Sequence, residues 1–344
     1  MDKSDSLRRS FLPEWSRQQA LLLVLPHEAT DWAYMLEEVH DCYRGILASL
    51  QGCGTPVHML VRSRAEAIRY LGLGALENVT LHETDYNDTW VRDYGPIAVR
   101  EDASMRLLDF GFNGWGLKFA SDRDNLVNLR MARNGFMSAS YVNQRDYVLE
   151  GGSVETDGQG TLLTTSRCLC SPNRNGGLTK QEVEKELSLR LGIRRVLWLD
   201  HGALAGDDTD SHIDTLARMA PDDTIIYVGC ADRDDEHFSD LQAMAAQLKE
   251  MRTDSGLPYN LMELPLPEAI FDEEEGIRLP ATYANYLITN NKVLVPAYGQ
   301  PLADELARLT VASVFPTRET VSVDCRALIR QHGSLHCATM QIPE

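Results

Sequence analysis

Residues 196–229 read VLWLDHGALAGDDTDSHIDTLARMAPDDTIIYVG, with a short apolar run at each end and an acidic, glycine-containing segment between them. Short runs of Val, Ile and Leu bounded by Gly, Pro and Asp predict buried strands. No helical pattern separates these two runs. Because strands and helices alternate in a doubly wound sheet, this stretch argues against that architecture.

Similar apolar runs recur along the whole chain and predict a strand-rich α/β protein. Further strands are predicted at ALLLVL from Ala20, VHMLV from Val57, IAVR from Ile97, TLLTT from Thr161, YLIT from Tyr286 and VLVPAY from Val293. Helical patterns cover residues 31–50, 63–71, 179–191, 238–251 and 301–312. The third begins with a capping box, Thr179 with Glu182, and ends before Gly192. Neither GxGxxG nor GxxxxGK[ST] occurs, so nucleotide-binding folds are not expected.

The charge balance is strongly acidic. The 344 residues include 51 Asp and Glu against 33 Lys and Arg, a formal net charge of −18. Such a chain lacks the basic surface that neutralises phosphates, so neither nucleic acid nor an anionic membrane is expected as a partner. A small cationic substrate suits this charge. The 43% hydrophobic content is enough for a large core and excludes a disordered chain.

No low-complexity tract, Pro/Ser-rich linker or visible repeat divides the chain, so residues 1–344 are predicted to form a single domain. The seven cysteines are dilute and lack framework spacing, which is typical of a reducing cytoplasm. The apolar run from Ala20 to Leu25 is too short for a secretory core, and no run reaches the roughly 18 apolar residues of a membrane span. We therefore expect a cytoplasmic protein without a transmembrane helix.

A candidate nucleophile lies near the C-terminus. The segment GSLHCATMQIP, residues 333–343, places Cys337 beside His336 in a stretch that opens with Gly and closes near Pro, as a strand end or loop facing a cleft would. A lone cysteine is most often a small buried apolar residue. A nucleophilic cysteine also needs a base and a group that controls its thiol pKa, which other segments must supply.

The segment DDTDSHIDTLARM, residues 207–219, supplies a candidate base. If it enters a strand, His212 and Asp214 point to one face, because side chains alternate with period two. The pair predicts a general acid/base beside a carboxylate that raises its pKa or holds a cation. Two alternatives stay open: a metal site built from Asp208, Asp210 and His212, and a solvated acidic loop.

Two further segments carry carboxylates next to turn signals. NDTWVRDYGP, residues 87–96, contains Trp90 and Asp93, although Trp90 as core with a surface ion pair of Arg92 and Asp93 is an equally plain interpretation. EGGSVETDGQGTLLTT, residues 150–165, places Glu150 before a flexible glycine pair and by itself indicates a hairpin. Taken with Cys337, these carboxylates suit a planar guanidinium, whose carbon a thiolate could attack while a histidine moves protons.

Seven motifs resemble those of the agmatine deiminase and bacterial peptidylarginine deiminase family. They stand in family order across positions 90–343: WVRDYGP at Trp90, FNGWG at Phe112, EGGSVETDGQGTLLTT at Glu150, PNRN at Pro172, DTDSHID at Asp208, RLPATYANYLI at Arg278 and GSLHCATMQIP at Gly333. The resemblance implies the pentein fold, a pseudo-fivefold α/β propeller of ββαβ modules. It also implies hydrolysis of a small cationic guanidine through a covalent cysteine thiouronium, without metal or cofactor, in polyamine (putrescine) biosynthesis.

The resemblance also assigns roles to residues. The family's nucleophile falls on Cys337, its proton shuttle on His212, and the glutamate that contacts substrate and histidine on Glu150. The guanidinium-binding aspartates fall on Asp93 and Asp214. Three residues are expected to line the channel as well: Trp90, Trp115 and Thr209. A homodimer is a further expectation from the resemblance.

Two departures from the family pattern concern the channel mouth. Arg330, Gln331 and His332 stand where many agmatine deiminases have glycines, and Ser211 stands where DTDGH has glycine. The substrate could thus be agmatine, free arginine or an arginine on a peptide. A non-catalytic binding protein on the same scaffold is the alternative from another functional class, because fold alone does not settle function.

Overall fold

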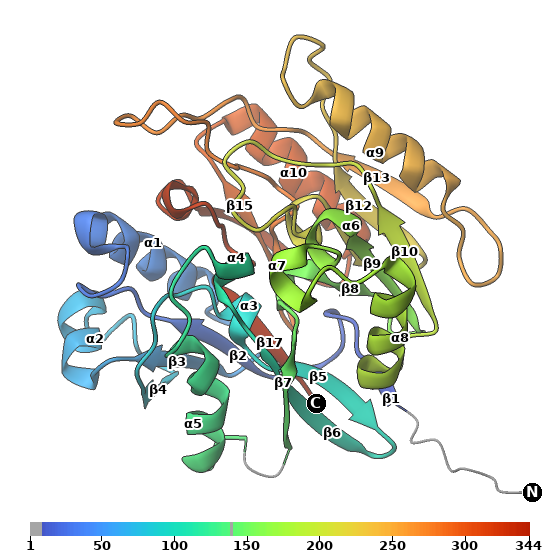
Figure 1. Ribbon diagram of the computed structural model, residues 1–344. Coiled ribbons are helices and arrows are strands. Elements are labelled where there is room, and N and C mark those ends of the chain that lie inside the picture. Colours follow the sequence, from blue (N-terminus) through green and yellow to red (C-terminus); the bar gives the residue numbers. More distant parts are fainter. Residues whose placement is uncertain (1–8, 138–139) are drawn as a thin grey trace, which may run out of the picture.

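A computed structural model describes residues 9–137 and 140–344. It contains five small β-sheets, and the main helices lie at the periphery of the strands (Figure 1). The C-terminal strand and the first long strand lie side by side in one sheet, of order β17(Thr339–Pro343)-β2(Gln18–Val24)-β3(Val57–Val61)-β4(Val79–Glu83). There β17 runs antiparallel to β2, with Thr339 opposite Leu23, so the segment bearing Cys337 is anchored to the first long strand.

The other four sheets follow in chain order. Their strand orders are β1(Arg9–Phe11)-β5(Ile97–Glu101)-β6(Ser104–Gly111)-β7(Tyr141–Val148), then β10(Arg195–Leu199)-β9(Thr161–Thr165)-β8(Glu155–Thr156), then β11(Ala217–Ala220)-β12(Thr224–Val228)-β13(Asn260–Leu264), and finally β14(Leu287–Ile288)-β15(Lys292–Ala297)-β16(Glu319–Asp324). Every sheet thus contains an antiparallel pair and at least one parallel pair.

A helix makes the crossover to the parallel strand in each sheet, as the geometry of parallel pairing requires. The helices in chain order are α1(Leu36–Ser49), α5(Val127–Arg133), α8(Lys180–Leu191), α9(Phe238–Glu250) and α10(Pro301–Val314), while α2(Arg64–Leu71) joins β3 to β4. Three apolar clusters between sheets and helices form the core, the largest including β2, β3, α1 and β15. Within the described residues, no helix has both the length and the apolar character needed to cross a membrane.

Most predicted elements are confirmed, with differences at their ends. Helix α8 has the predicted capping box at Thr179 and ends at Gly192, whose φ of 75° is left-handed. The helix predicted over 31–50 instead begins with a 3-10 turn, Ala33–Met35, and becomes α-helical only at Leu36. The strand predicted from Tyr286 is reduced to Leu287–Ile288.

The conditional strand at His212 and Asp214 is wrong. His212 precedes a 3-10 turn, η4(Ile213–Thr215), and β11 begins only at Ala217. Asp210 and Ser211 have positive φ of 64° and 67°, a turn that an alternating strand cannot contain. The Asp207 carboxylate stabilises this turn by accepting hydrogen bonds from the Thr209 and Ser211 backbone amides.

Candidate active site

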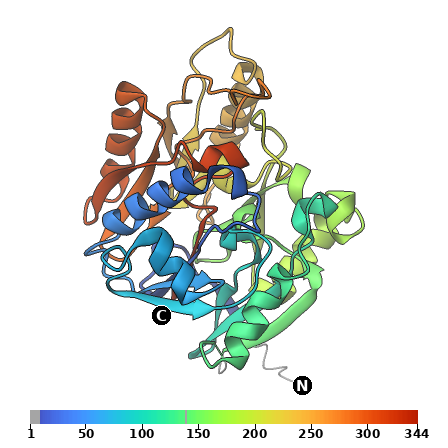
Figure 2. The same cartoon turned by 90° about the vertical axis from the view of Figure 1, so that its left-hand side faces the viewer.

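A cavity of about 110 Å³ opens where residues from distant parts of the sequence meet. Its lining consists of Asp31, Asp88, Trp90, Asp93, Trp115, Phe119, Asp208, Thr209, Thr215, Gln331, His332, Gly333 and Cys337. In Figure 2 the dark-red turn η5(Leu328–Gln331) lies beside the blue helix α1, and Gln331 donates a hydrogen bond to the carbonyl of Asp31 across this junction. Of the two departures from the family pattern, the first reaches this cavity through Gln331 and His332, whereas Ser211 is buried and is not among the lining residues.

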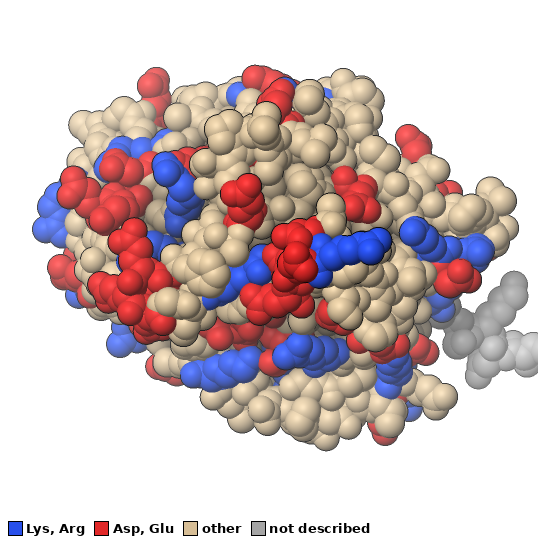
Figure 3. Space-filling view, turned by 90° about the horizontal axis from the view of Figure 1, so that it is seen from above, with Lys and Arg blue, Asp and Glu red and all other residues tan. Residues whose placement is uncertain are grey.

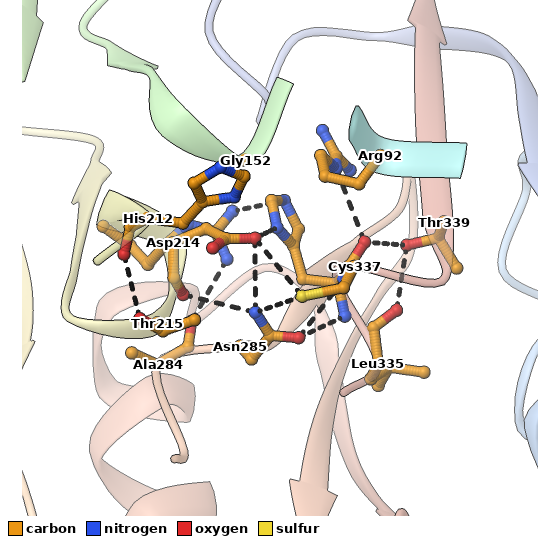
Figure 4. A network of polar contacts seen from close by, with 12 residues as sticks. Arg92, Gly152, His212, Asp214, Thr215, Ala284, Asn285, Leu335, Cys337 and Thr339 are labelled. Carbon is orange, nitrogen blue, oxygen red and sulfur yellow. Dashed lines mark hydrogen bonds and ion pairs between the residues drawn. The ribbon is translucent and has the colours of Figure 1, made fainter. Parts of the chain in front are cut away.

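Cys337 lies at the inner end of this cavity and is 6% exposed. It follows η5 in a turn that leads into β17. Asn285 holds the turn: its Oδ1 accepts hydrogen bonds from the backbone amides of His336 and Cys337, and its Nδ2 lies 3.2 Å from the Cys337 Sγ (Figure 4). The sulfur lies 3.7 Å from Asp214 Oδ2. The nucleophile candidate is thus fixed and faces a carboxylate.

Asp93 and Trp90 come from the short helix α3(Val91–Tyr94) and its N-cap. Both Asp93 oxygens have donors, because Trp115 Nε1 lies 2.9 Å from Oδ2 and the Gly152 backbone amide lies 3.0 Å from Oδ1. The Trp90 ring packs against Trp32 and lines the cavity. The alternative interpretation, a surface ion pair of Arg92 with Asp93, is wrong, because both residues are buried and Arg92 binds Glu14 instead.

His212 is fully buried between two carboxylates. Its Nε2 lies 3.0 Å from Glu150 Oε2, and its Nδ1 lies 3.5 Å from Asp93 Oδ1. Arg174 fixes the Glu150 carboxylate that contacts this ring, because its Nε donates to the same Glu150 oxygen at 2.8 Å. In Figure 4 the Asp214 carboxylate lies between the His212 ring and the sulfur of Cys337.

Gly152 marks the point where the site's side chains converge. A Cβ at this position would lie 2.7 Å from His212 Nδ1, 2.8 Å from Asp93 Oδ1 and 3.0 Å from Asp214 Oδ2. These three groups therefore share one small space, which exists only because residue 152 has no side chain. In the residues around this point, Asp214 Oδ1, the neighbouring Glu150 Oε1 and His212 Nδ1 are buried without a hydrogen-bond partner.

Thr209 positions the histidine loop. Its hydroxyl donates to Asp207 and accepts from the His212 backbone amide at 3.0 Å. Arg174 ties this loop to the Glu150 segment, because its two terminal nitrogens donate to Asp210 Oδ2 and to the Thr209 carbonyl. Ser211 adopts the left-handed backbone that glycine adopts readily, at the position where the family pattern has glycine.

Burial and charge shift the pKa values of the site in different directions. Burial raises the pKa of Cys337 well above its usual value, and the nearby Asp214 and Asp93 add to this. Burial, reinforced by Asp214 and Glu150, raises the pKa of Asp93 to about 6. Burial alone would lower the pKa of His212, but Asp93 and the other anionic neighbours raise it well above 6.5.

Burial would raise the pKa of Glu150 and of Asp214, but hydrogen bonds and charges from neighbouring side chains lower both. For Glu150 these are the hydrogen bonds and charges of His212 and Arg174. For Asp214 the main one is the hydrogen bond from His336. The free site therefore favours an ionised Glu150 and Asp214, a protonated His212 and a neutral thiol.

The metal site considered from the sequence is not assembled. Asp210 pairs with Arg174 and Lys118, and the His212 ring is turned toward Glu150 and Asp93. Among the residues that the structure describes, two other clusters have metal-ligand atoms close together: Glu150 with Cys168 and His212, and Glu14 with Glu155 and His336. An arginine guanidinium contacts a carboxylate of each cluster and supplies the positive charge that an ion would otherwise bring.

Sequence reasoning gave no role to several residues that build this site. Arg174 lies in the quoted PNRN and Asn285 in RLPATYANYLI, so both were visible as motif members. Gly152 was noted only as a flexible glycine, although its lack of a side chain makes the shared space. Glu14 could not be found, because nothing in its local sequence indicates that it approaches His336.

Comparison with known proteins identifies the family. The model of the Porphyromonas-type peptidyl-arginine deiminase family matches residues 10–343. A candidate agmatine deiminase from Shewanella baltica (strain OS223) is 32% identical over 354 residues, covering 96% of this chain and 93% of that protein.

Two solved structures are also similar over the whole chain. A candidate arginine deiminase from Porphyromonas gingivalis is 47% identical with a TM-score of 0.90 and covers 98% of both chains. A cysteine-to-serine variant of C. jejuni agmatine deiminase with substrate bound is 36% identical with a TM-score of 0.92, covering 100% of this chain and 99% of that one. The mixed α/β fold of this protein is theirs, and the chain belongs to the Porphyromonas-type peptidyl-arginine deiminase family.

Proposed function

We propose that this protein is a guanidine deiminase that hydrolyses agmatine to N-carbamoylputrescine and ammonia. The observation that carries the proposal is the shared space at Gly152, where His212, Asp93 and Asp214 converge beside the thiol of Cys337. Family membership supports the reaction class, hydrolysis of a carbon–nitrogen bond. The nucleophile role of Cys337, the shuttle role of His212 and the binding roles of Asp93, Asp214 and Glu150 are part of this proposal.

The unpartnered buried atoms suit a planar cation. Asp214 Oδ1 and Glu150 Oε1 are acceptors without donors, and a guanidinium offers N–H groups that can satisfy both. The indole rings of Trp90 and Trp115 line the cavity, so the flat ligand has apolar walls as well as charged edges. Binding would therefore relieve the cost of leaving these polar atoms unpaired.

The proposed chemistry has two halves. First, the Cys337 thiolate adds to the guanidinium carbon, the carbon–nitrogen bond breaks, and His212 gives a proton to the departing nitrogen, which leaves as ammonia. Second, His212 takes a proton from water and the resulting hydroxide adds to the thiouronium carbon. The carbon–sulfur bond then breaks to return the thiolate, and the added hydroxyl releases its proton to solvent as the ureido carbonyl forms. The sum is guanidine plus water giving a ureido group and ammonia.

The channel mouth favours agmatine over arginine. Three carboxylates line the cavity beyond Trp90, those of Asp31, Asp88 and Asp208, and no Lys or Arg is among the described lining residues. Burial and the charge of Asp31 raise the pKa of Asp88 to about 7. A cation bound beside these two carboxylates would favour the ionised form of Asp88. Such a mouth attracts the distal ammonium of agmatine and repels the α-carboxylate of free arginine.

Acidic groups are also frequent on the wider surface. Seen from above, acidic side chains gather on the left and at the centre of the face, next to basic ones (Figure 3). The net charge of −18 therefore adds a general attraction for cationic substrates to the local effect of the mouth.

A peptidylarginine or free-arginine deiminase is the second candidate, favoured by the family description and by the P. gingivalis relative. The test compares kcat/KM for agmatine, arginine and an arginine-containing peptide, with Cys337→Ala as the blank. We expect agmatine to exceed arginine by at least about ten-fold, the equivalent of about 1.4 kcal/mol of discrimination. A preference for the peptide or for arginine would contradict the agmatine assignment.

The same experiment separates the remaining alternatives. Ureido product that is still formed after exhaustive chelation speaks against a metallohydrolase, and absence of product from every guanidine would favour a non-catalytic binding protein.

We further propose that residues 1–344 form one domain in which the five sheets make a pentein propeller of ββαβ units. Homodimer formation is a prediction for sedimentation analysis.

A further inference from the structure

A buried ion cluster lies directly behind the candidate active site. Its centre is Glu14, from the segment between β1 and β2, whose carboxylate contacts Arg92 at 2.7 Å and Arg218 at 2.5 Å. Gln341 donates to the same carboxylate at 3.1 Å. The Glu14 side chain is 19% exposed and lines a small rear pocket, separate from the substrate cavity.

His336 connects this cluster to the site. Its Nδ1 lies 2.8 Å from Asp214 Oδ2, and its Nε2 lies 2.8 Å from Glu14 Oε1. Its backbone amide is fixed by Asn285, the residue that also holds Cys337. The imidazole therefore bridges two carboxylates from opposite sides, and the Asp214 oxygen that it reaches is the one facing the thiol.

The two aspartates of the site differ in how they are supported. The hydrogen bonds to Asp93 come from neutral donors, Trp115 and the Gly152 amide. Asp214 instead faces the bridged imidazole, and its pKa is lowered whereas that of Asp93 is raised to about 6. Among the groups that lower the pKa of Asp214, the hydrogen bond from His336 is the largest, and Asp93 has no counterpart to it.

We propose that His336 and Glu14 are positioning residues whose bridge keeps the Asp214 carboxylate ionised and directed at the substrate guanidinium and the thiol. This inference rests on the proposed function. The contact with Glu14 fixes the far side of the ring, and the near nitrogen is thereby directed at Asp214. Neither residue touches the substrate cavity, so both act through Asp214.

Other charged groups also face the bridge, and one of them provides the control for the experiment. Around Asp214 and His336 these are Asp93, His212 and Cys337 on the cavity side, and Arg92, Arg218 and Glu155 on the rear side. Arg218 Nη2 lies 3.0 Å from His336 Nε2 and also contacts Glu14, so it stabilises the anionic end of the bridge. Glu155 binds Arg218 but makes no hydrogen bond to His336, which makes it a matched control.

The sign of the Glu14→Gln effect distinguishes a bridge from simple electrostatics. Removing a nearby negative charge would by Coulomb's law make Asp214 easier to ionise. Under the proposal the substitution loosens the hydrogen bond from His336 and makes Asp214 harder to ionise, so Asp214 behaves like Asp93. Below about pH 6 two protons then oppose guanidinium binding instead of one, and kcat/KM falls with the second power of proton concentration.

The experiment measures kcat/KM for agmatine from about pH 5 to about pH 8 in the whole protein, for wild type, Glu14→Gln, His336→Asn and Glu155→Gln. Relative to its own plateau, each bridge variant is expected to be about ten-fold below wild type at about pH 5, with a limiting slope near two. Glu155→Gln is expected to keep the wild-type slope of one. Only folded protein contributes to the measured rate, so partial misfolding lowers the plateau of kcat/KM without changing the slope of its pH dependence.

A second measurement follows the same pH range by alkylation of Cys337 with 2-chloroacetamidine, a cationic probe that needs no turnover. Bridge variants are again expected to lose reactivity more steeply than wild type. An unchanged slope in both assays, or a limb displaced to lower pH in Glu14→Gln, would overturn the bridge while leaving the deiminase assignment intact. A wild type that hydrolyses no guanidine but shows the alkylation difference would instead overturn the proposed function alone.

Discussion

Replacing Gly152 with alanine tests the geometry on which the proposed site depends. The added methyl carbon would lie 2.7 Å from His212 Nδ1, 2.8 Å from Asp93 Oδ1 and 3.0 Å from Asp214 Oδ2. Ordinary contacts for such a carbon begin at about 3.4 Å, so all three groups would have to move by several tenths of an ångström. They cannot move freely, because each is buried and held by other hydrogen bonds.

The expected effect follows from packing energies. Overpacking a buried position costs about 1–3 kcal/mol. If this cost weakens substrate binding, the dissociation constant rises by roughly five- to 150-fold. Displacing the binding groups by a fraction of an ångström adds a loss in alignment of reacting atoms, for which a 1 Å error costs roughly 10²-fold. We therefore expect Gly152→Ala to reduce kcat/KM for agmatine by about 10²-fold or more, mainly through KM.

The assay combines steady-state kinetics with thermal unfolding. Gly45→Ala is the matched control: Gly45 lies within α1 with no atom near the position of an added Cβ, so the change should leave kcat/KM intact and stabilise the helix by about 0.5–1 kcal/mol. A folded Gly152→Ala variant with wild-type kcat/KM would refute the reasoning, because it would show that guanidinium binding does not depend on the close approach of these three groups to residue 152.

Three further predictions concern single groups of the site. Guanidinium binding needs the Asp93 carboxylate, whose pKa is raised to about 6, so wild-type kcat/KM should rise with pH up to about 6 and fall about ten-fold per unit below it; a flat profile there would contradict this role. Arg174→Lys keeps one of three hydrogen bonds, so kcat/KM should fall by roughly ten-fold or more, whereas Arg190→Lys at a more exposed fork with Asp146 should stay near wild type. Cys337 should react faster with cationic 2-chloroacetamidine than with neutral iodoacetamide, and Asp93→Asn should reduce that ratio; equal rates in the wild type would argue against an anionic cleft.

The sequence predicts most helices and strands correctly, because capping residues and apolar runs depend only on neighbouring residues. The Thr179–Glu182 capping box and the apolar run from Val57 depend on neighbours within a few residues, and both elements form as expected. The segment of His212 and Asp214 does not form a strand, for an equally local reason. The Asp207 carboxylate accepts hydrogen bonds from the turn that contains Asp210 and Ser211, and this side-chain-to-backbone bonding overrides a period-two pattern.

The composition of the site was visible in motifs, but its supports were not. Cys337, His212 and Asp93 lie in strings that carry their own chemistry, whereas Glu14 acts on a histidine 322 residues away. No periodicity or spacing rule links positions that only the tertiary fold brings together. Residues that act through another side chain can therefore be recognised only when the fold shows which side chain they contact.

The charge of the site indicates when the thiol becomes reactive. A nucleophilic cysteine is usually activated by a neighbouring cation, but among the described residues that line this cavity there is no Lys or Arg. Burial and two aspartates instead hold the thiol neutral in the free protein. A bound guanidinium would supply the missing positive charge next to the sulfur and neutralise Asp93 and Asp214 at the same moment. Activation is therefore expected to depend on the substrate, and the same carboxylates that bind the cation prevent the empty site from holding a reactive thiolate.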